Sequence, residues 1–115
     1  MKNICLCKIY LVLLVIFSPS VFAGWQSGKI TGYIPYSVDN KEVLIFRIVN
    51  NVGGGCNNTT RFAISDDNIR YQSTFAAILT AFSSNKMIRV NYTESCNAWG
   101  NSWDANFICV GDIPC

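Results

Sequence analysis

The chain has 115 residues, of which 14% are charged and 50% are hydrophobic. Two of its nine basic residues, Lys2 and Lys8, lie in the first 23 residues, and the seven that remain match seven acidic residues. The remainder of the chain is formally neutral, so the small basic excess of the whole chain does not indicate nucleic acid or anionic membranes as partners, and we expect no nucleic acid. The sequence has no histidine, which removes most Ser-His and Cys-His catalytic schemes and the usual metal ligand. Because its carboxylates are also scattered, we expect no enzymatic activity, no metal and no cofactor.

The first 23 residues have the features of a secretory signal peptide. Two lysines precede an unbroken apolar run at 9–17, which is too short to span a bilayer as a mature helix. A polar break at 18–20 and a small-x-small cleavage signal at 21–23 follow. We expect cleavage after Ala23, export to the periplasm and then secretion, and a single mature domain at 24–115 with no membrane-spanning segment. The alternative is an uncleaved N-terminal anchor, which the polar break and the cleavage signal disfavour.

Four cysteines remain after the signal peptide. An even number in an exported chain argues for disulfides, and the spacings lack the paired C-x-x-C of a zinc knuckle. Four cysteines allow three pairings. Only Val-Gly-Asp-Ile-Pro separates Cys109 from Cys115, and its glycine and proline let the chain turn back. We prefer this pair together with Cys56–Cys96, which would tie a glycine-rich loop to a later loop.

The mature chain divides into short strands around one helix. Apolar runs and alternating patterns predict five strands, with a turn at 38–41, a glycine-rich connection at 50–58 and a loop at 94–104. In chain order we expect a leader at 24–27, strands at 29–36, 42–49 and 60–64, a helix at 71–85, and strands at 86–93 and 105–110.

The helix expected at 71–85 contains no Lys, Arg, Asp or Glu. Its large apolar side chains recur at the spacing of one helical stripe, which predicts that this stripe packs on the core. Asp66 and Asp67 precede it, where carboxylates can cap open N–H groups and favour the helix dipole. The residues on the opposite face of the helix are small and uncharged, as in a helix that is packed on both sides. The stripe comprises Tyr71, Phe75, Ile78, Leu79 and Phe82, and the opposite face comprises Ser73, Ala76, Ala77, Thr80 and Ser84.

Three strands, one helix and two strands is the element order of an OB-fold. This fold is a five-stranded, partly open barrel with its helix between the third and fourth strands. Five short strands cannot fill a barrel and close both of its ends, and a helix with one apolar stripe can plug an open end. We therefore expect a mainly β OB-fold. The alternative is an α+β sandwich with the helix lying flat on an antiparallel sheet, which the element order does not exclude.

The loop at 94–104 holds the candidate ligand-binding side chains. In OB-folds the loop between the fourth and fifth strands often joins a ligand face for oligosaccharides or oligonucleotides, and the neutral charge disfavours oligonucleotides. Aromatic rings stack on the apolar faces of sugars, so Trp99, Asn101 and Trp103 are candidates for glycan binding. The alternative is that the tryptophans cover the core or a subunit contact, and we favour it for so small a domain.

The chain resembles the binding (B) subunits of bacterial AB5 toxins of the subtilase cytotoxin and pertussis-like type. The resemblance rests on a secretory signal that ends just before a Trp-containing start at Gly24-Trp25, and on a small all-β domain with one helix in the OB position. It also rests on the helix motif YQSTFAAILTAFSSNKMIRVNY, which runs into a strand, and on the Cys109–Cys115 pair at the C-terminus. It covers most of the mature chain as a pattern rather than as identity.

This resemblance implies a homopentameric ring that presents glycan sites to a host cell. The helices would line a central pore that receives the tail of a catalytic A subunit, and small residues would let a neighbouring helix or the tail approach closely. The chain is shorter than usual members, its Cys56 and Cys96 do not sit where the family's first pair is expected, and no sialic-acid-binding residue can be matched. The alternative function is a stand-alone secreted or periplasmic protein of structural or inhibitory role. The pore-lining candidates are Ala76, Ala77, Thr80 and Ser84.

Overall fold

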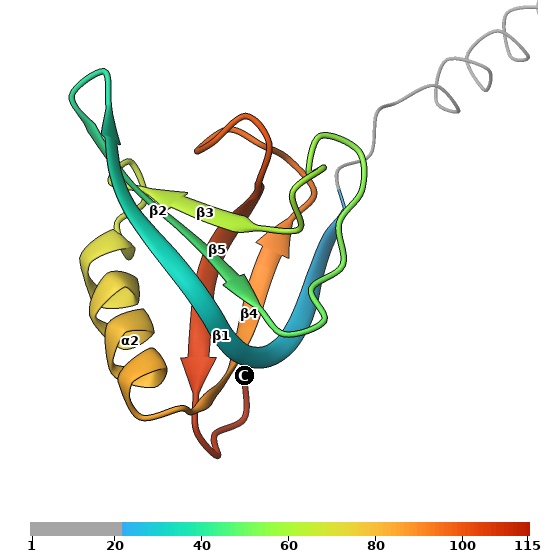
Figure 1. The fold of residues 1–115 in the computed structure, drawn as a ribbon, viewed down its shortest axis with the longest axis vertical. Coiled ribbons are helices and arrows are strands. Elements are labelled where there is room, and N and C mark those ends of the chain that lie inside the picture. The colour runs from blue at the N-terminus through green and yellow to red at the C-terminus, as the bar shows by residue number, and fades with distance from the viewer. Residues whose placement is uncertain (1–21) are drawn as a thin grey trace, which may run out of the picture.

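The computed structural model describes residues 22–115 (Figure 1). Most of the predicted signal peptide lies outside the described residues. The described chain is mainly β with a single helix, as the sequence predicted. In chain order its elements are β1 (Ala23–Val38), β2 (Lys41–Ile48), β3 (Phe62–Ser65), α2 (Tyr71–Ser83), β4 (Met87–Thr93) and β5 (Trp103–Val110).

The five strands form a sheet whose hydrogen bonding closes into a ring. The strand order is β1-β2-β3-β5-β4, and β4 pairs in turn with β1. Neighbouring strands are antiparallel except β3 and β5, which are parallel where Phe62 faces Trp103 and Ala63 faces Asp104. The helix α2 stands beside this ring and contacts β1 and β5 (Figure 1). A ring has no open sheet for a helix to lie across, so the fold differs from the α+β sandwich.

The first strand is longer than expected. β1 contains 16 residues and includes the segment 24–27, which the sequence analysis treated as a leader. Its first part, 23–29, pairs with β4, and its second part, 30–38, pairs with β2. The register shifts between Ile30 and Gly32, where the strand passes from one partner to the other. Gly28 allows the close crossing there, because a Cβ at that position would lie 2.9 Å from the carbonyl oxygen of Val49.

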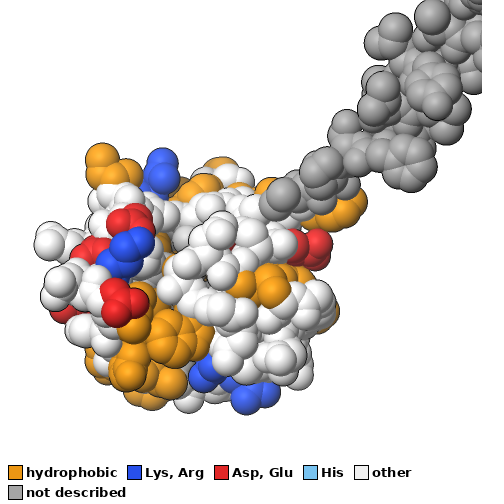
Figure 2. Space-filling view, turned by 90° about the horizontal axis from the view of Figure 1, so that it is seen from above, with side chains coloured by type: hydrophobic (Ala, Val, Ile, Leu, Met, Phe, Trp, Pro, Cys, Tyr) orange, Lys and Arg blue, Asp and Glu red, His pale blue; other side chains and the backbone are white. Residues whose placement is uncertain are grey.

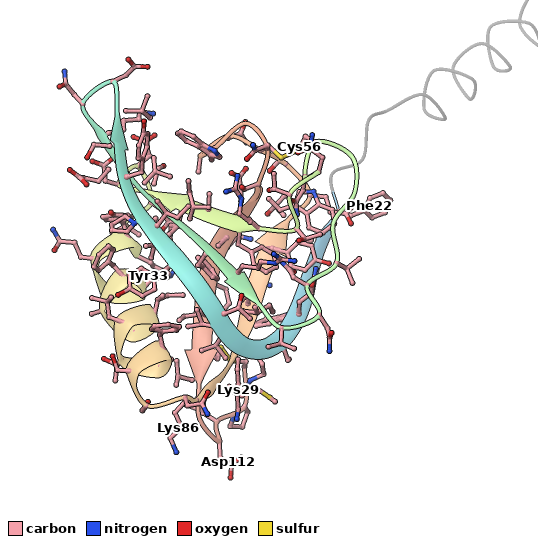
Figure 3. The ribbon with its side chains drawn as sticks, in the orientation of Figure 1. Phe22, Lys29, Tyr33, Cys56, Lys86 and Asp112 are labelled. Carbon is pink, nitrogen blue, oxygen red and sulfur yellow. A yellow bond between two sulfur atoms is a disulfide. The ribbon has the colours of Figure 1, made fainter. Side chains whose placement is uncertain are left out.

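The core lies inside the ring, and most of the expected stripe packs on it: Ile78 is buried, and Tyr71 and Phe75 are partly buried against the core. The helix residues that are buried are Thr74, Ile78 and Ala81. Phe82, placed in the stripe by the sequence analysis, is 43% exposed and meets the ring of Tyr33 edge-on at 5.4 Å (Figure 3). Thr74 and Ala81 are buried beside Ile78, so the side of the helix that faces the core includes these two small residues and leaves Phe82 outside. The largest fully buried core side chains are Leu44, Phe46, Ile48, Phe62, Ile64, Ile78 and Ile88.

The expected capping of the helix by Asp66 and Asp67 is wrong. The N-cap residue is Arg70, and no side chain caps the helix. Asp66 instead accepts a hydrogen bond from the backbone N–H of Glu42, and Asp67 pairs with Lys41. Both carboxylates therefore fasten the turn before α2 to the start of β2. They lie too far before the helix to reach its first N–H groups.

Both preferred disulfides are present. Cys56 and Cys96 are bonded with Cα atoms 6.2 Å apart, and Cys109 and Cys115 are bonded with Cα atoms 6.5 Å apart. The first bridge joins the glycine-rich connection before β3 to the loop between β4 and β5 (Figure 3). It therefore fixes two irregular segments at the same end of the ring.

Removing the Cys56–Cys96 bridge should destabilise the protein more than removing the C-terminal bridge. The first closes a loop with a sequence separation of 40 and the second a separation of 6. In the chain-entropy account these correspond to about 4 and about 2 kcal/mol. Urea unfolding of the double variants C56S/C96S and C109S/C115S measures the difference. Equal losses of unfolding free energy would contradict it.

Candidate functional site

The outer face of β1, β2 and β3 carries a second apolar cluster, separate from the core. Along these strands, alternate side chains point into the ring and away from it. Three outward side chains, Val43, Ile45 and Ala63, are nevertheless buried, because Ala98 and Trp99 pack over them from the loop at 94–104. This surface, with the side chains around it, is called here the outer face.

Two aromatic side chains meet on the outer face. Tyr36 of β1 is 48% exposed, and Trp99 is half-buried. Their rings lie edge-to-face with centroids 5.2 Å apart and planes at 78°. Such a pair offers an apolar surface with a phenolic hydroxyl and an indole N–H at its margin, which suits a ligand that is apolar in places and polar in others.

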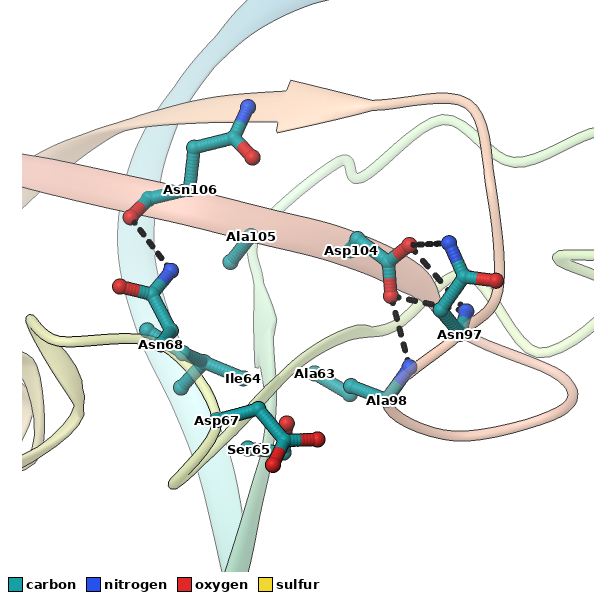
Figure 4. A pocket seen from close by; sticks show the side chains of 10 residues that line it. All are labelled: Ala63, Ile64, Ser65, Asp67, Asn68, Asn97, Ala98, Asp104, Ala105 and Asn106. Carbon is teal, nitrogen blue, oxygen red and sulfur yellow. Dashed lines mark hydrogen bonds between the residues drawn. The ribbon is translucent and has the colours of Figure 1, made fainter.

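Asp104 holds the loop that carries Trp99 (Figure 4). Its Oδ1 accepts hydrogen bonds from the backbone N–H groups of Asn97 (2.9 Å) and Ala98 (2.8 Å). Its Oδ2 accepts from the Asn97 side-chain amide (3.0 Å) and from the Ser95 hydroxyl (2.5 Å). Hydrogen bonds to a charged acceptor are the stronger kind, so this carboxylate fixes the path of the chain up to Trp99.

The structure separates the three candidate glycan-binding residues. Trp99 lies on the outer face. Asn101 is engaged inside the protein, where its Oδ1 accepts a hydrogen bond from Nη2 of Arg61 (2.9 Å). Trp103 is 5% exposed and stacks on Tyr92 with ring centroids 5.1 Å apart, so its ring is part of the core. Of the three, only Trp99 lies on the outer face.

A groove of about 450 Å³ continues the outer face away from the aromatic pair. Its side chains on β1 and β2 include Ile34, which is 45% exposed, and Arg47; Arg61 closes it from the chain just before β3. The sequence analysis missed Tyr36, Ile34 and both arginines. The sequence held one clue to this groove: Arg47 is the one charged residue in an otherwise apolar stretch of β2.

Charged side chains gather at the β1–β2 hairpin end of the same strands. Lys41 pairs with Asp67, and the hydrogen bond and charge of Asp67 raise the pKa of Lys41 above its usual value. Nearby, burial raises the pKa of Tyr71, with a further contribution from the negative charges of Glu42 and Asp66. Figure 2 shows acidic and basic side chains clustered at one side of the domain, next to a group of hydrophobic side chains.

A second hollow, of about 280 Å³, lies where β3 and β5 separate beyond their short parallel pairing (Figure 4). The side-chain amide of Asn68 bridges this gap by donating to the backbone oxygen of Asn106 at 3.1 Å. Its carboxylates, Asp67 and Asp104, are both already paired within the protein. Within residues 22–115 no cluster of three potential metal ligands occurs. We therefore assign this hollow a structural role in closing the ring.

Compared with protein-family models, curated proteins and solved structures, the chain matches none. In the part of the chain that the structure describes, no helix is long and apolar enough to cross a membrane.

Replacing Asp104 should loosen the loop that carries Trp99. The variant D104A leaves the N–H groups of Asn97 and Ala98 without their acceptor, and we expect a loss of about 2 kcal/mol in the free energy of unfolding. The matched control is D112A, at an exposed acid in the C-terminal turn, which should change stability by less than about 0.5 kcal/mol. Urea unfolding followed by tryptophan fluorescence measures both. A D104A protein as stable as D112A would show that the carboxylate does not hold the loop.

Proposed function

We propose that this chain is an exported glycan-binding module with an OB-fold, and that it acts as the B subunit of an AB5-like toxin. In this proposal five copies form a ring that binds a host-surface glycan and delivers a catalytic A subunit. The observation that carries it is the Tyr36–Trp99 pair on the outer face, beside a groove that runs along β1 and β2.

The arrangement of strands supports an OB-fold assignment. The helix falls between β3 and β4, and the strands are hydrogen-bonded in a ring. Proteins with this fold bind oligosaccharides and oligonucleotides on the face of strands 2 and 3, with help from the loop between strands 4 and 5. In this chain strands 2 and 3 supply the apolar cluster and the loop between strands 4 and 5 supplies Trp99, while Tyr36 joins them from β1. The aromatic pair carries no charge of its own, which suits the apolar face of a sugar ring.

The outer surface of α2 supports assembly into a ring. No residue of the helix is charged, and Ala76 and Thr80 are exposed. The hydroxyls of Thr80, Ser83 and Ser84 all donate to backbone oxygens one turn earlier in the helix. A neighbouring helix could therefore cover this surface without leaving a buried hydroxyl donor unpaired. The half-buried Leu79 and exposed Phe82 on its flank would gain burial in the same contact.

A stand-alone secreted or periplasmic protein of structural or inhibitory role is the second candidate. The burial of Trp103 and the internal hydrogen bond of Asn101 favour it, because they show that two of the three expected ligand contacts serve the fold. In that case the chain would be monomeric and would bind no sugar.

Replacing Trp99 should weaken glycan binding strongly without unfolding the protein. The variant W99A removes one ring of the aromatic pair, and loss of a stacking tryptophan at a binding hot spot costs 2 kcal/mol or more, roughly a thirtyfold loss of affinity. The matched control is W25A, since Trp25 is also partly exposed but packs against Phe107 of β5. A glycan array followed by titration of the best ligand gives the affinities. Equal binding by W99A and the parent protein would remove the outer face as the site.

The mass of the mature protein in solution tests the ring. We expect light scattering on a sizing column to give a pentamer, and the variant A76E/T80E to give a monomer, because unpaired charges would be buried in the interface. A double control, N57E/N58E, is not suitable because Asn57 is buried, so N58E, which places one such charge in an exposed loop, serves as the control and should leave the pentamer intact. A monomeric parent protein across a wide range of concentration would favour the stand-alone function.

A further inference from the structure

The bond that signal peptidase is expected to cut lies inside β1. Cleavage after Ala23 would break the peptide bond between Ala23 and Gly24. In the structure these two residues already belong to the sheet, because Ala23 pairs with Thr93 and Gly24 pairs with Tyr92 of β4. The first residues of β1 are therefore both the end of the predicted signal peptide and the start of the pairing between β1 and β4.

Contacts with β4 extend to both sides of this bond. On the side of the signal peptide, the backbone N–H of Glu94 donates to the carbonyl oxygen of Phe22 at 2.8 Å, at the end of the ring (Figure 3). On the mature side, Gly24 packs so closely against Tyr92 that a Cβ would lie 2.6 Å from the Tyr92 hydroxyl oxygen. The ring of Tyr92 is packed against the core and stacked on Trp103. The bond is thus held against a well-packed part of the sheet.

Two side chains just after the bond fasten the start of β1 to other segments. The side chain of Gln26 makes a reciprocal pair with the backbone of Val52: its Nε2 donates to the Val52 oxygen at 3.2 Å, and its Oε1 accepts from the Val52 N–H at 2.8 Å. The ring of Trp25 meets Phe107 of β5 edge-on, with centroids 5.5 Å apart. These contacts oppose the fraying that is usual at a chain end.

A protease needs the segment around its target bond in a free, extended form. An enzyme that binds a peptide as an added strand does so through the backbone N–H and C=O groups of that peptide. Here β4 already uses backbone groups on both sides of the bond. Cleavage of the folded chain therefore depends on the small population in which the start of β1 has detached from the sheet.

We infer that cleavage of the signal peptide must precede closure of the ring, because the folded precursor holds the bond between Ala23 and Gly24 in the sheet and resists signal peptidase. The reaction is a hydrolysis. The oxygen of water joins the carbonyl carbon of Ala23, the bond to the nitrogen of Gly24 breaks, and both protons of the water end on that nitrogen, which leaves a carboxylate and an ammonium. The inference rests on the export in the proposed function and does not depend on glycan binding.

Cleavage of the full 115-residue precursor in two states tests this order. One sample is folded with both disulfides formed, and the other is reduced and diluted from urea directly into the reaction; each receives purified bacterial signal peptidase in a mild detergent. We expect the unfolded precursor to give a product that begins at Gly24, and the folded precursor to be cut about a hundredfold more slowly. Opening the start of β1 breaks at least two hydrogen bonds, and each lowers the open population by up to about tenfold. Mass spectrometry follows the product over time.

Variants that loosen the start of β1 should speed the cleavage of the folded precursor. Q26A removes the reciprocal pair with Val52, and W25A removes the contact with Phe107, so we expect each to raise the rate about tenfold. The matched control is Q72A, because Gln72 is exposed on α2. For every variant the rate of the folded form is divided by the rate of its unfolded form, so that any effect on recognition by the enzyme cancels.

The outcomes separate this inference from the export on which it rests. Equal rates for the folded and unfolded parent precursor would overturn the inference and leave export standing. An unfolded precursor that is not cut between Ala23 and Gly24 would overturn both. Protection as strong in Q26A and W25A as in Q72A would also overturn the inference, since the contacts at the start of β1 would then not be its cause.

Discussion

The fold depends on one strand pairing with two partners. β1 bonds to β4 through its first part and to β2 through its second, and without that continuity the ring would open into a single sheet with free edges. The crossing is tight, because Gly28 brings the backbone of β1 against the backbone after β2. The weakest part of the ring lies opposite, where β3 and β5 share two residue pairs and the side chain of Asn68 bridges the remaining gap. Everything else, including α2 and the loop with Trp99, is attached to this ring.

Local patterns were enough to predict the order of the elements and both disulfides. The alternation in β4 and the apolar run of β2 each reflect a strand with a buried face, which is a property of the strand itself. The length of β1 could not be predicted in the same way. Its segment 24–27 is polar and glycine-containing, and it is a strand because β4 supplies hydrogen bonds from a position more than sixty residues later. The orientation of α2 likewise depends on the ring, which accepts Thr74, Ile78 and Ala81 and leaves Phe82 outside.

The candidate site could be predicted only in part. Trp99 was singled out because aromatic and polar residues are concentrated in its loop, and it does lie at the surface. Trp103 stands four residues later in the same loop sequence but begins β5, where its ring completes the core. Sequence alone gives both tryptophans the same chemical character, and only the point at which the strand begins separates them. Tyr36, Arg47 and Arg61 come from three separate segments, and it is strand register that brings them to one surface.

The fastening of the loop at 94–104 has a consequence for how tightly the outer face can hold a partner. A loop that is ordered only on binding loses conformational freedom at that moment, and this loss subtracts from affinity. Here Asp104 and the Cys56–Cys96 bridge have already restricted the loop in the free protein. Trp99 is thus pre-organised, and in the proposed complex most of the interaction free energy at its ring would remain available for binding. Such a rigid surface selects partners by shape, because it cannot remodel itself around a poorly fitting one.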